Sequence, residues 1–262
     1  MIRNLFIIAV AGAGLAILCG LGAVALGGPQ LLQHGWTIVD VRESDGHTIF
    51  NTPDGRVTVT AGHELQTRSL PWAGASALTV AVPGDVTFRQ AAEYSVSVTG
   101  PASIVDRIRI EGDRLSIVGE GQRGQLRLDR DGFRMLSDTD RLRVVVSGPN
   151  VERFVVEGSG DLTIEGYDRP SMAVVVEGSG DVLANGRTAA LTLEVTGSGD
   201  ADLAAVRAGS VEVTVSGSGD AEVAPSGAAA VVIDGSGDVT LATRPSVLTQ
   251  TVNGSGEVMQ RS

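Results

Sequence analysis

The sequence predicts an all-β protein, specifically a right-handed parallel β-helix (β-solenoid) with rungs of about 20 residues. The first observation is a tetrapeptide, Gly-Ser-Gly-Asp, that recurs at a nearly fixed step. It begins at Gly158, Gly178, Gly197, Gly217 and Gly235, and a sixth copy, Gly254 to Glu257, ends in Glu. The steps between the first glycines are 20, 19, 20, 18 and 19 residues. A period of this size is typical of repeats that stack on one another.

The second observation is an alternation of apolar and polar residues on both sides of each tetrapeptide. Leu162 and Ile164 illustrate the row after it, and polar or small residues fill most of the positions between. This period of two predicts strands with one face inward. Two residues before each first glycine we expect one inward stack, formed by Val156, Val176, Val195, Val215 and Ile233. Each repeat should therefore run strand, corner, short strand, loop, with loops at residues 167–171 and 224–227.

The third observation excludes two other repeat architectures. The repeats lack the i, i+3, i+4, i+7 apolar pattern of a helix, and two glycines per copy would cost a helix about 2 kcal/mol. A β-propeller blade needs about twice this period. Equivalent strands of neighbouring copies should instead pair in parallel at about 4.8 Å per rung. The right-handed coiling follows from the usual hand of parallel crossovers.

The tetrapeptide suits a sharp corner between strands. Glycine reaches positive φ without steric cost, so two glycines let the chain turn. Ser and Asp side chains can hydrogen-bond nearby backbone groups in the turn. Stacking the copies should align a ladder of serines beside a ladder of acids.

This acidic ladder is the one array in the repeats that could form a site. Neighbouring carboxylates about 4.8 Å apart would repel each other by about 0.9 kcal/mol in water, and Ca²⁺ would relieve that repulsion. The nine-residue Gly-Gly-x-Gly-x-Asp calcium repeat is absent, however. We therefore expect structural corners, no metal and no cofactor, and keep as metal-ligand candidates Asp161, Asp181, Asp200, Asp220, Asp238 and Glu257.

The sequence offers no catalytic residues, and we predict a protein that is not an enzyme. It contains no Lys, and its three histidines, His34, His47 and His63, all precede the repeats. The Gly-Ser-Gly runs fall at β corners, unlike the strand-to-helix turn of a hydrolase nucleophile. Two alternatives stay open at this point: a polysaccharide-binding or polysaccharide-cleaving β-helix protein, and a Ca²⁺-dependent binding module.

Residues 1–28 predict an export segment, either a signal peptide or a helical membrane anchor. Arg3 gives a positive start, and Leu5 to Leu26 is an uncharged apolar run of 22 residues. That length suffices to span a bilayer. The single cysteine, Cys19, falls inside it, so the exported part has no disulfide. We expect a periplasmic, inner-membrane-anchored or cell-surface protein.

The net charge of −11 and the scarcity of aromatic residues, 3%, limit the classes of partner. So acidic a chain makes nucleic acid an unfavourable partner. The predicted partners are an unknown envelope protein or a glycan, with membrane association through residues 1–28 if they are retained, and with self-association open. Few rings are available to stack on sugars.

The remaining segments divide the chain into residues 29–75, irregular with short strands, and residues 76–262, the solenoid domain. Within 29–75, Trp36 to Val39 and Arg56 to Thr60 predict strands, with a turn at Asp54-Gly55. Residues 94–117 and 142–164 predict degenerate copies of the repeat. Residues 119–140 predict an insertion or a long hairpin.

The recurring row Val-x-Val-x-Gly-Ser-Gly-Asp-(Val/Leu)-x-(Leu/Ile), behind an export segment, resembles the putative auto-transporter adhesin head GIN domain. The resemblance covers about residues 76–258 and includes Tyr94 to Val98 and Asp113 to Ile117. It implies a right-handed β-helical fold, a cell-surface or periplasmic location and no catalytic residues to transfer. Together these observations predict an exported, non-enzymatic envelope protein that presents a repetitive acidic surface for adhesion, scaffolding or protein interaction. Gly148-Pro149 departs from the corner pattern.

Overall fold

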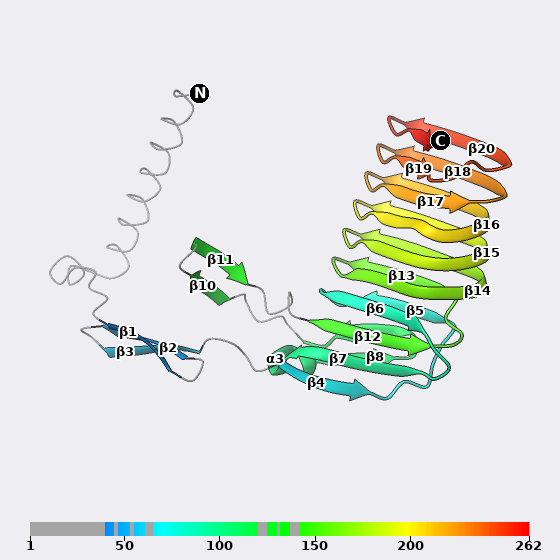
Figure 1. Ribbon diagram of the computed structural model, residues 1–262. Coiled ribbons are helices and arrows are strands. Elements are labelled where there is room, and N and C mark those ends of the chain that lie inside the picture. Colours follow the sequence, from blue (N-terminus) through cyan, green and yellow to red (C-terminus); the bar gives the residue numbers. More distant parts are fainter. Residues whose placement is uncertain are drawn as a thin grey trace, which may run out of the picture. The chain divides into compact units, whose positions relative to one another are not determined.

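The computed structural model describes residues 65–119 and 142–261 with their side chains (Figure 1). It also describes the backbone of five strands, which are β1 (Asp40–Ser44), β2 (His47–Thr52), β3 (Gly55–Thr60), β10 (Gln125–Asp129) and β11 (Gly132–Leu136). The predicted export helix and the predicted strand at Trp36 lie outside the described residues. In the described part of the chain, no helix has the length and hydropathy needed to cross a membrane.

The chain divides into two compact units, residues 1–63 and residues 64–262. In the first unit, β1, β2 and β3 form an antiparallel sheet in that order. The strand predicted at residues 56–60 is therefore confirmed. Thr52 pairs with Gly55 at the end of the β2–β3 hairpin, where the turn was expected.

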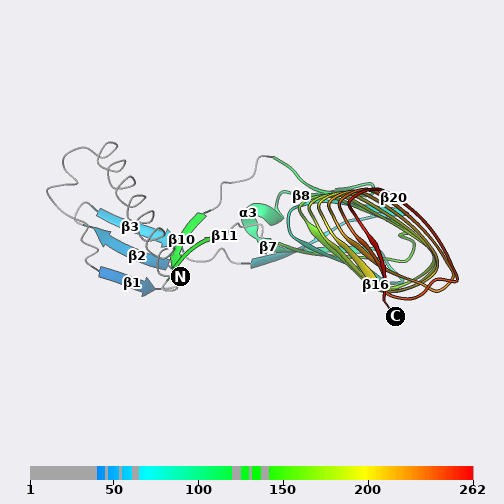
Figure 2. The same cartoon turned by 90° about the horizontal axis from the view of Figure 1, so that it is seen from above.

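The second unit is built around a parallel β-solenoid, which confirms the all-β prediction. Each rung stacks on the next through parallel pairs, and the view along the stack in Figure 2 shows a flattened, closed coil. The hand of the coil stays a prediction. The strands of the rungs are β5 (Ala77–Ala81), β6 (Asp85–Gln90), β13 (Arg153–Gly158), β14 (Asp161–Gly178), β15 (Val182–Gly197), β16 (Ala201–Gly217), β17 (Ala221–Pro225), β18 (Ala228–Gly235), β19 (Val239–Leu241), β20 (Val247–Gly254) and β21 (Val258–Gln260).

The hydrophobic core lies inside this coil, and the predicted inward stack is confirmed. Val156 pairs with Val176, and Val195 pairs with both Val176 and Val215, which in turn pairs with Ile233. All five side chains are fully buried. Because the apolar period is preserved from copy to copy, each rung buries the face that its neighbour leaves open.

One predicted loop is wrong. Residues 167–171 are not a loop but part of the long strand β14, where Tyr167 pairs with Gly186 and Asp168 with Arg187. The chain bends through a register shift between Ile164 and Tyr167, next to Gly166 at φ +66°. Residues 167–171 stay extended because their backbone groups pair with β15. The turn expected at residues 224–227 is confirmed, since β17 ends at Pro225 and the chain bends before β18.

The degenerate copy predicted at residues 94–117 is right only for its last strand, Arg114–Ile117, which stacks in parallel on β5; the rest has a different topology. Its first strand, β7 (Ser95–Pro101), pairs antiparallel with β4 (Leu65–Leu70) and β12 (Arg143–Gly148). A short helix, α3 (Ala102–Val105), then leads to an antiparallel hairpin of β8 (Ile108–Glu111) and β9 (Arg114–Ile117). Alternating apolar residues predicted the strands correctly, but the same alternation suits parallel and antiparallel pairing.

The first rung of the solenoid comes earlier in the chain, at β5 and β6. Its corner, Val82-Pro83-Gly84-Asp85, lacks the first glycine and the serine of the repeat. Asp85 nevertheless pairs in register with Asp161, and β13 stacks on β5. The segment from β7 to β12 thus interrupts the solenoid between its first and second rungs. Inside it, β10 and β11 form an antiparallel hairpin, which confirms the hairpin expected in residues 119–140.

One ion pair fastens this interruption to the solenoid, and a second joins the short segment between β12 and β13 to β14. Arg114 on β9 donates to both carboxylate oxygens of Glu157 on β13, at 2.7 and 2.6 Å. Arg169 donates to Glu152 at 2.6 Å. The hydrogen bonds from these arginines lower the pKa of Glu157 and of Glu152.

We expect the stability of the protein to fall as pH drops through the acid range. A carboxyl group whose pKa is depressed on folding stabilises the fold above its unfolded pKa, near 4.5 for Glu157, and that contribution disappears as pH falls through the folded pKa. Thermal melts between about pH 7 and pH 3 should show this decline. The Glu157→Gln variant should show a shallower decline, and an identical pH profile would contradict the assignment.

Candidate functional site

The structure brings the six predicted acids together along one edge of the solenoid. In each step the side chain of one acid accepts a hydrogen bond from the backbone N–H of the next acid. The N–H of Asp181 donates to Asp161 Oδ1 and that of Asp200 to Asp181 Oδ1, both at 2.9 Å. The N–H groups of Asp220, Asp238 and Glu257 donate in the same way to the acid one rung before, each at 2.8 Å. The acidic ladder is therefore a continuous hydrogen-bonded staircase.

The backbone carbonyls of the ladder are also engaged. The Asp181 carbonyl accepts from the N–H of Leu162 at 2.8 Å, and the Asp200 carbonyl accepts from Val182 at 2.9 Å. The same contact recurs in the later rungs. Asp181, Asp200, Asp220 and Asp238 thus each link two rungs through both the side chain and the main chain. Sequence reasoning expected these side chains to bond within their own turn, but they bond to the next rung instead.

The first glycine of each corner supplies another inter-rung acceptor. The Gly158 carbonyl accepts from the N–H groups of Ser179 and Gly180, at 2.8 and 3.0 Å, and later corners repeat this forked contact. The serine side chains stay exposed. Together with the glycines they line a shallow, open groove of about 640 Å³ along the corners of β13 to β16.

The two glycines of a corner are required for different reasons. The first has a positive φ, +124° at Gly178, and an added Cβ would lie 2.5 Å from the Gly158 carbonyl oxygen. The second, such as Gly180, does not have a φ in the left-handed region, yet a Cβ there would lie closer than 3.0 Å to the Gly160 carbonyl oxygen. Close approach of neighbouring backbones therefore excludes side chains at both positions.

The chemistry of the ladder is that of hydrogen-bond acceptors in fixed positions. One oxygen of each aspartate from Asp161 to Asp238 is committed to a backbone N–H. Among residues 65–119 and 142–261, no three His, Cys, Asp or Glu side chains are grouped so that they could hold a metal ion. The side chains of the three histidines lie outside this part of the chain.

Two substitutions of Asp200 separate the effect of its hydrogen bond on stability from the effect of its charge. Asp200→Ala removes the acceptor for the Asp220 N–H and should cost about 1 kcal/mol of unfolding free energy. Asp200→Asn keeps an acceptor oxygen and removes like-charge repulsion, so its stability should stay within about 0.5 kcal/mol of the wild type, or rise slightly. Urea unfolding of the two variants measures both values. Equal losses in both would show that the charge, not the hydrogen bond, matters.

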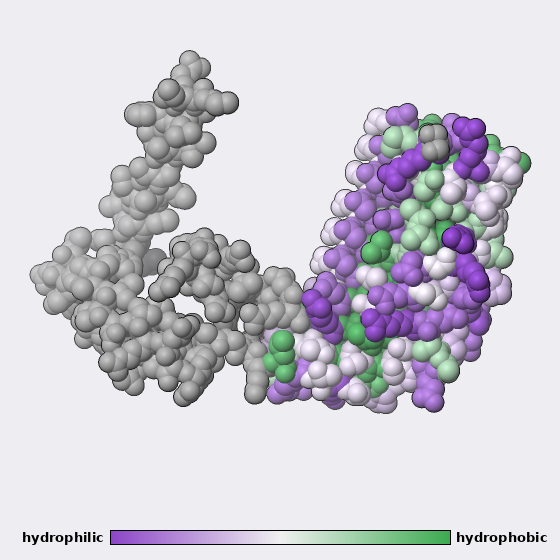
Figure 3. All heavy atoms as spheres, viewed as in Figure 1, coloured by the Kyte–Doolittle hydropathy of each residue, from purple (hydrophilic) through white to green (hydrophobic). Residues whose placement is uncertain are grey.

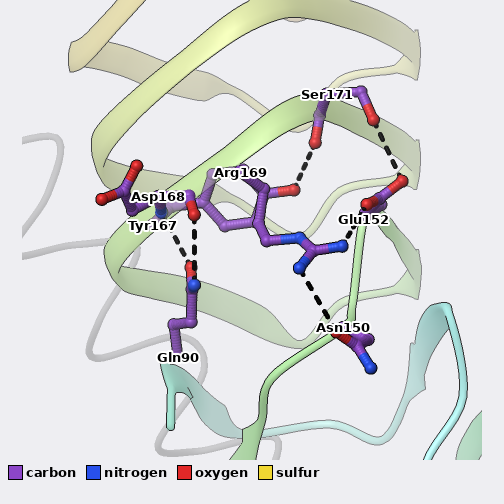
Figure 4. Close-up of polar contacts among 7 residues, drawn as sticks. All are labelled: Gln90, Asn150, Glu152, Tyr167, Asp168, Arg169 and Ser171. Carbon is purple, nitrogen blue, oxygen red and sulfur yellow. Dashed lines mark hydrogen bonds and ion pairs between the residues drawn. The ribbon is translucent and has the colours of Figure 1, made fainter. Parts of the chain in front are cut away.

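A second polar cluster, which sequence reasoning missed, joins the first rung to the returning chain (Figure 4). The Gln90 side chain accepts from the Asp168 N–H at 2.7 Å and donates to the Asp168 carbonyl at 3.2 Å. Glu152 accepts from Arg169 at 2.6 Å and from the Ser171 hydroxyl at 3.0 Å. These residues come from segments far apart in the sequence and outside the repeated motif, so no periodicity marked them. Their contacts are structural, since they tie β6 and the segment that leads into β13 to β14.

The comparisons with known proteins agree with this architecture. The family model described as "putative auto-transporter adhesin, head GIN domain" matches residues 76–245. Among curated proteins none matches the chain.

Solved structures of bacterial proteins resemble the chain at low sequence identity. A putative adhesin from Bacteroides fragilis NCTC 9343 is 17% identical with a TM-score of 0.58, over 76% of this chain and 98% of that one. A putative adhesin and a putative lipid binding protein from Parabacteroides distasonis ATCC 8503, both 16% identical, have TM-scores of 0.45 and 0.42, over 76% of this chain and 97% of each of theirs. The Bacteroides structure supports the fold. Because the family model spans most of the chain, from the first rung nearly to the last, the protein belongs to the head GIN domain family.

Proposed function

We propose that this protein is a non-enzymatic, exported protein of the bacterial envelope, whose β-solenoid presents a repetitive surface for adhesion, scaffolding or protein interaction. The observation that carries this proposal is the staircase of inter-rung hydrogen bonds at the corners. It fixes identical polar groups one rung apart along an exposed edge. Such an edge offers many equivalent contacts to a partner, whereas catalysis needs a few groups that converge on one reacting atom.

The surface beside the corners suits binding to a broad partner. The groove lined by Gly158, Ser159, Ser179, Ser198 and Ser218 is open and shallow. The face seen in Figure 3 mixes hydrophilic and hydrophobic residues. We propose that the acidic ladder gives its edge a negative character, because the carboxylates of Asp161, Asp181, Asp200 and Asp220 are exposed. Protein–protein interfaces commonly combine such polar and apolar contacts.

Family membership supports the adhesive role. The family is described as an adhesin head domain, and the structure from Bacteroides fragilis is described as a putative adhesin. Export rests on the predicted segment 1–28, and a periplasmic, anchored or surface position is consistent with an adhesin-like relative.

Cell fractionation tests the export part of the proposal. A tagged full chain should appear in the membrane, periplasmic or surface fraction, and a variant that lacks residues 1–28 should stay in the cytoplasm. Because residues 64–262 form their own compact unit, the shortened variant should keep the solenoid. A full chain recovered in the cytoplasm would contradict export.

Attachment assays test the binding part. Cells that produce the full chain should aggregate or attach to surfaces more than cells that produce a variant lacking residues 64–262. Surface labelling of the tag shows whether the protein is reachable from outside. Equal aggregation and attachment by the two strains, with the full chain accessible at the surface, would argue against adhesion.

A further inference from the structure

The two ends of the solenoid differ in how their outermost strands are covered. At the first rung, β5 pairs with β9 and β6 pairs with β12, and the buried Ile104 and Val105 of α3 join the core at that end (Figure 1). At the last rung, β20 pairs only with β18 among the described strands, and β21 pairs only with β19. In the described part of the chain, the end formed by β20 and β21 is therefore an open edge.

The inward side chains of the last rung lie at this open end. Leu248, Gln250 and Val252 continue the inward rows, since each pairs with a buried residue of β18. Leu248 and, on β21, Val258 pack against the core, whereas 39% of the surface of Val252 is exposed and Gln250 is exposed as well. The last rung thus leaves open the inward positions that the rungs before it bury.

The edge strands at this end lack the features that normally keep an exposed strand from pairing. Such strands are usually protected by charged side chains, by proline or by bulges. β20 and β21 contain no charged residue and no proline, and β20 pairs with β18 without a register shift. At the covered end, by contrast, the outermost strands carry charges, with Arg68 on β4 and with Arg109 and Glu111 on β8. The edge of β20 is therefore suited to pair with another strand.

A second copy of the same strand fits this edge. A two-fold axis at Gln250 pairs two β20 strands antiparallel, so that Gln250 faces itself and Leu248 faces Val252. Apolar residues then meet at the inward positions, and the two Gln250 amides can donate to and accept from each other. Stacking of the open end on the covered end of another copy is disfavoured, because charged strands lie at the covered end.

The charges beside β20 and the size of a rung suit the same arrangement. Antiparallel pairing brings the corner after β20 of one copy beside the loop before β20 of the other. The exposed Glu257 in that corner then approaches the exposed Arg244 in the loop of the second copy. A rung of 18 to 20 residues is also close to the roughly 20–30 residues that each partner contributes to a standard interface.

We propose that the open end of the solenoid is a self-association surface, through which two copies form a tail-to-tail dimer with their β20 strands paired antiparallel. The dimer carries the hydrophobic core and the backbone hydrogen bonding of the solenoid from one copy into the other. Because a two-fold contact uses the same surface on both copies, the assembly closes at two and does not grow into a filament. This association goes beyond the proposed function and is independent of the partner that the exposed corners bind.

Site-directed cross-linking of the full chain tests the pairing. Gln250→Cys in a Cys19→Ser background places the single thiol of each copy on the two-fold axis, where opposite Cβ atoms lie about 4.5–5.5 Å apart. A short bismaleimide should therefore yield a cross-linked dimer on a denaturing gel. Ser198→Cys in the same background is the matched control, since Ser198 is exposed on a middle rung, and it should stay monomeric on the gel. No dimer from Gln250→Cys, or as much dimer from the control, would overturn the proposal.

A charge exchange at the same position tests the register of the two strands. Gln250→Lys and Gln250→Glu each set two like charges face to face, so each variant alone should dimerise about tenfold or more weakly than the wild type. An equal mixture of the two variants should restore the dimer, because opposite charges then face each other. Analytical ultracentrifugation measures the masses, and Ser198→Lys should dimerise as the wild type does. A monomeric wild type, single variants that dimerise as well as the wild type, or a mixture that stays monomeric would contradict this dimer.

Discussion

Replacing Gly178 with alanine is expected to lower the free energy of unfolding by about 2–5 kcal/mol. A non-glycine residue held at the φ of +124° costs about 1–3 kcal/mol. The added Cβ also meets the Gly158 carbonyl oxygen at 2.5 Å, and forcing extra volume into packed structure typically costs about another 1–3 kcal/mol. That oxygen accepts two inter-rung hydrogen bonds, so any displacement of it weakens the corner as well. Urea unfolding followed by circular dichroism measures the loss.

Gly158→Ala is the matched control for this prediction. Gly158 has a φ of +91°, but a Cβ built on it meets nothing within 4 Å. In the control, only backbone strain should lower the free energy of unfolding, by about 1–3 kcal/mol. Gly158→Ala should therefore be more stable than Gly178→Ala. Equal losses would show that the approach of neighbouring rungs does not require the glycine. A wild-type stability in both would mean that the corner does not hold these backbone angles.

Replacing Phe154 with alanine is expected to cost about 3–5 kcal/mol. The side chain is fully buried at the centre of the aromatic cluster, with ring centroids 4.9 Å from Phe88 and 5.9 Å from Tyr167. It joins the first rung, which holds Phe88, to the bend of β14, which holds Tyr167. The variant would leave a cavity at the point where the interrupted chain rejoins the solenoid. A lower urea midpoint should accompany the loss.

The control for this variant uses the same register position in the last rung. Successive pairs lead from Phe154 through Val174, Leu193, Val213 and Val231 to Gln250. Gln250 is exposed, so Gln250→Ala should change the stability by no more than about 0.5 kcal/mol. If Gln250→Ala lowered the free energy of unfolding as much as Phe154→Ala does, this position would be equally buried in the first and last rungs. That result would contradict the structure.

The repeated half of the fold could be predicted from the sequence because its pattern is local and is preserved between copies. Val156 and its equivalents occupy one position in every repeat, and parallel stacking carries that position unchanged from rung to rung. The corner glycines and the alignment of the acids followed from the same period. The non-repeating part was harder, because β7 alternates as a rung strand would but pairs antiparallel with β4.

The functional surfaces were less predictable than the fold. The role of Asp161 as an acceptor for the next rung depends on the direction in which its side chain points, which the repeat spacing does not define. The first corner was missed because Val82-Pro83-Gly84-Asp85 keeps only the last two residues of the motif.

The central claim is that the acidic ladder is structural, and a calcium titration of the melting temperature tests it most directly. The ladder oxygens bonded to backbone N–H groups are already satisfied, so millimolar Ca²⁺ should leave the melting temperature of the wild type and of Asp200→Asn nearly unchanged. A ligand present at about one hundred times its dissociation constant adds about 2.7 kcal/mol of stability. A large Ca²⁺-dependent rise in the wild type that disappears in Asp200→Asn would contradict the account and make the ladder a metal site.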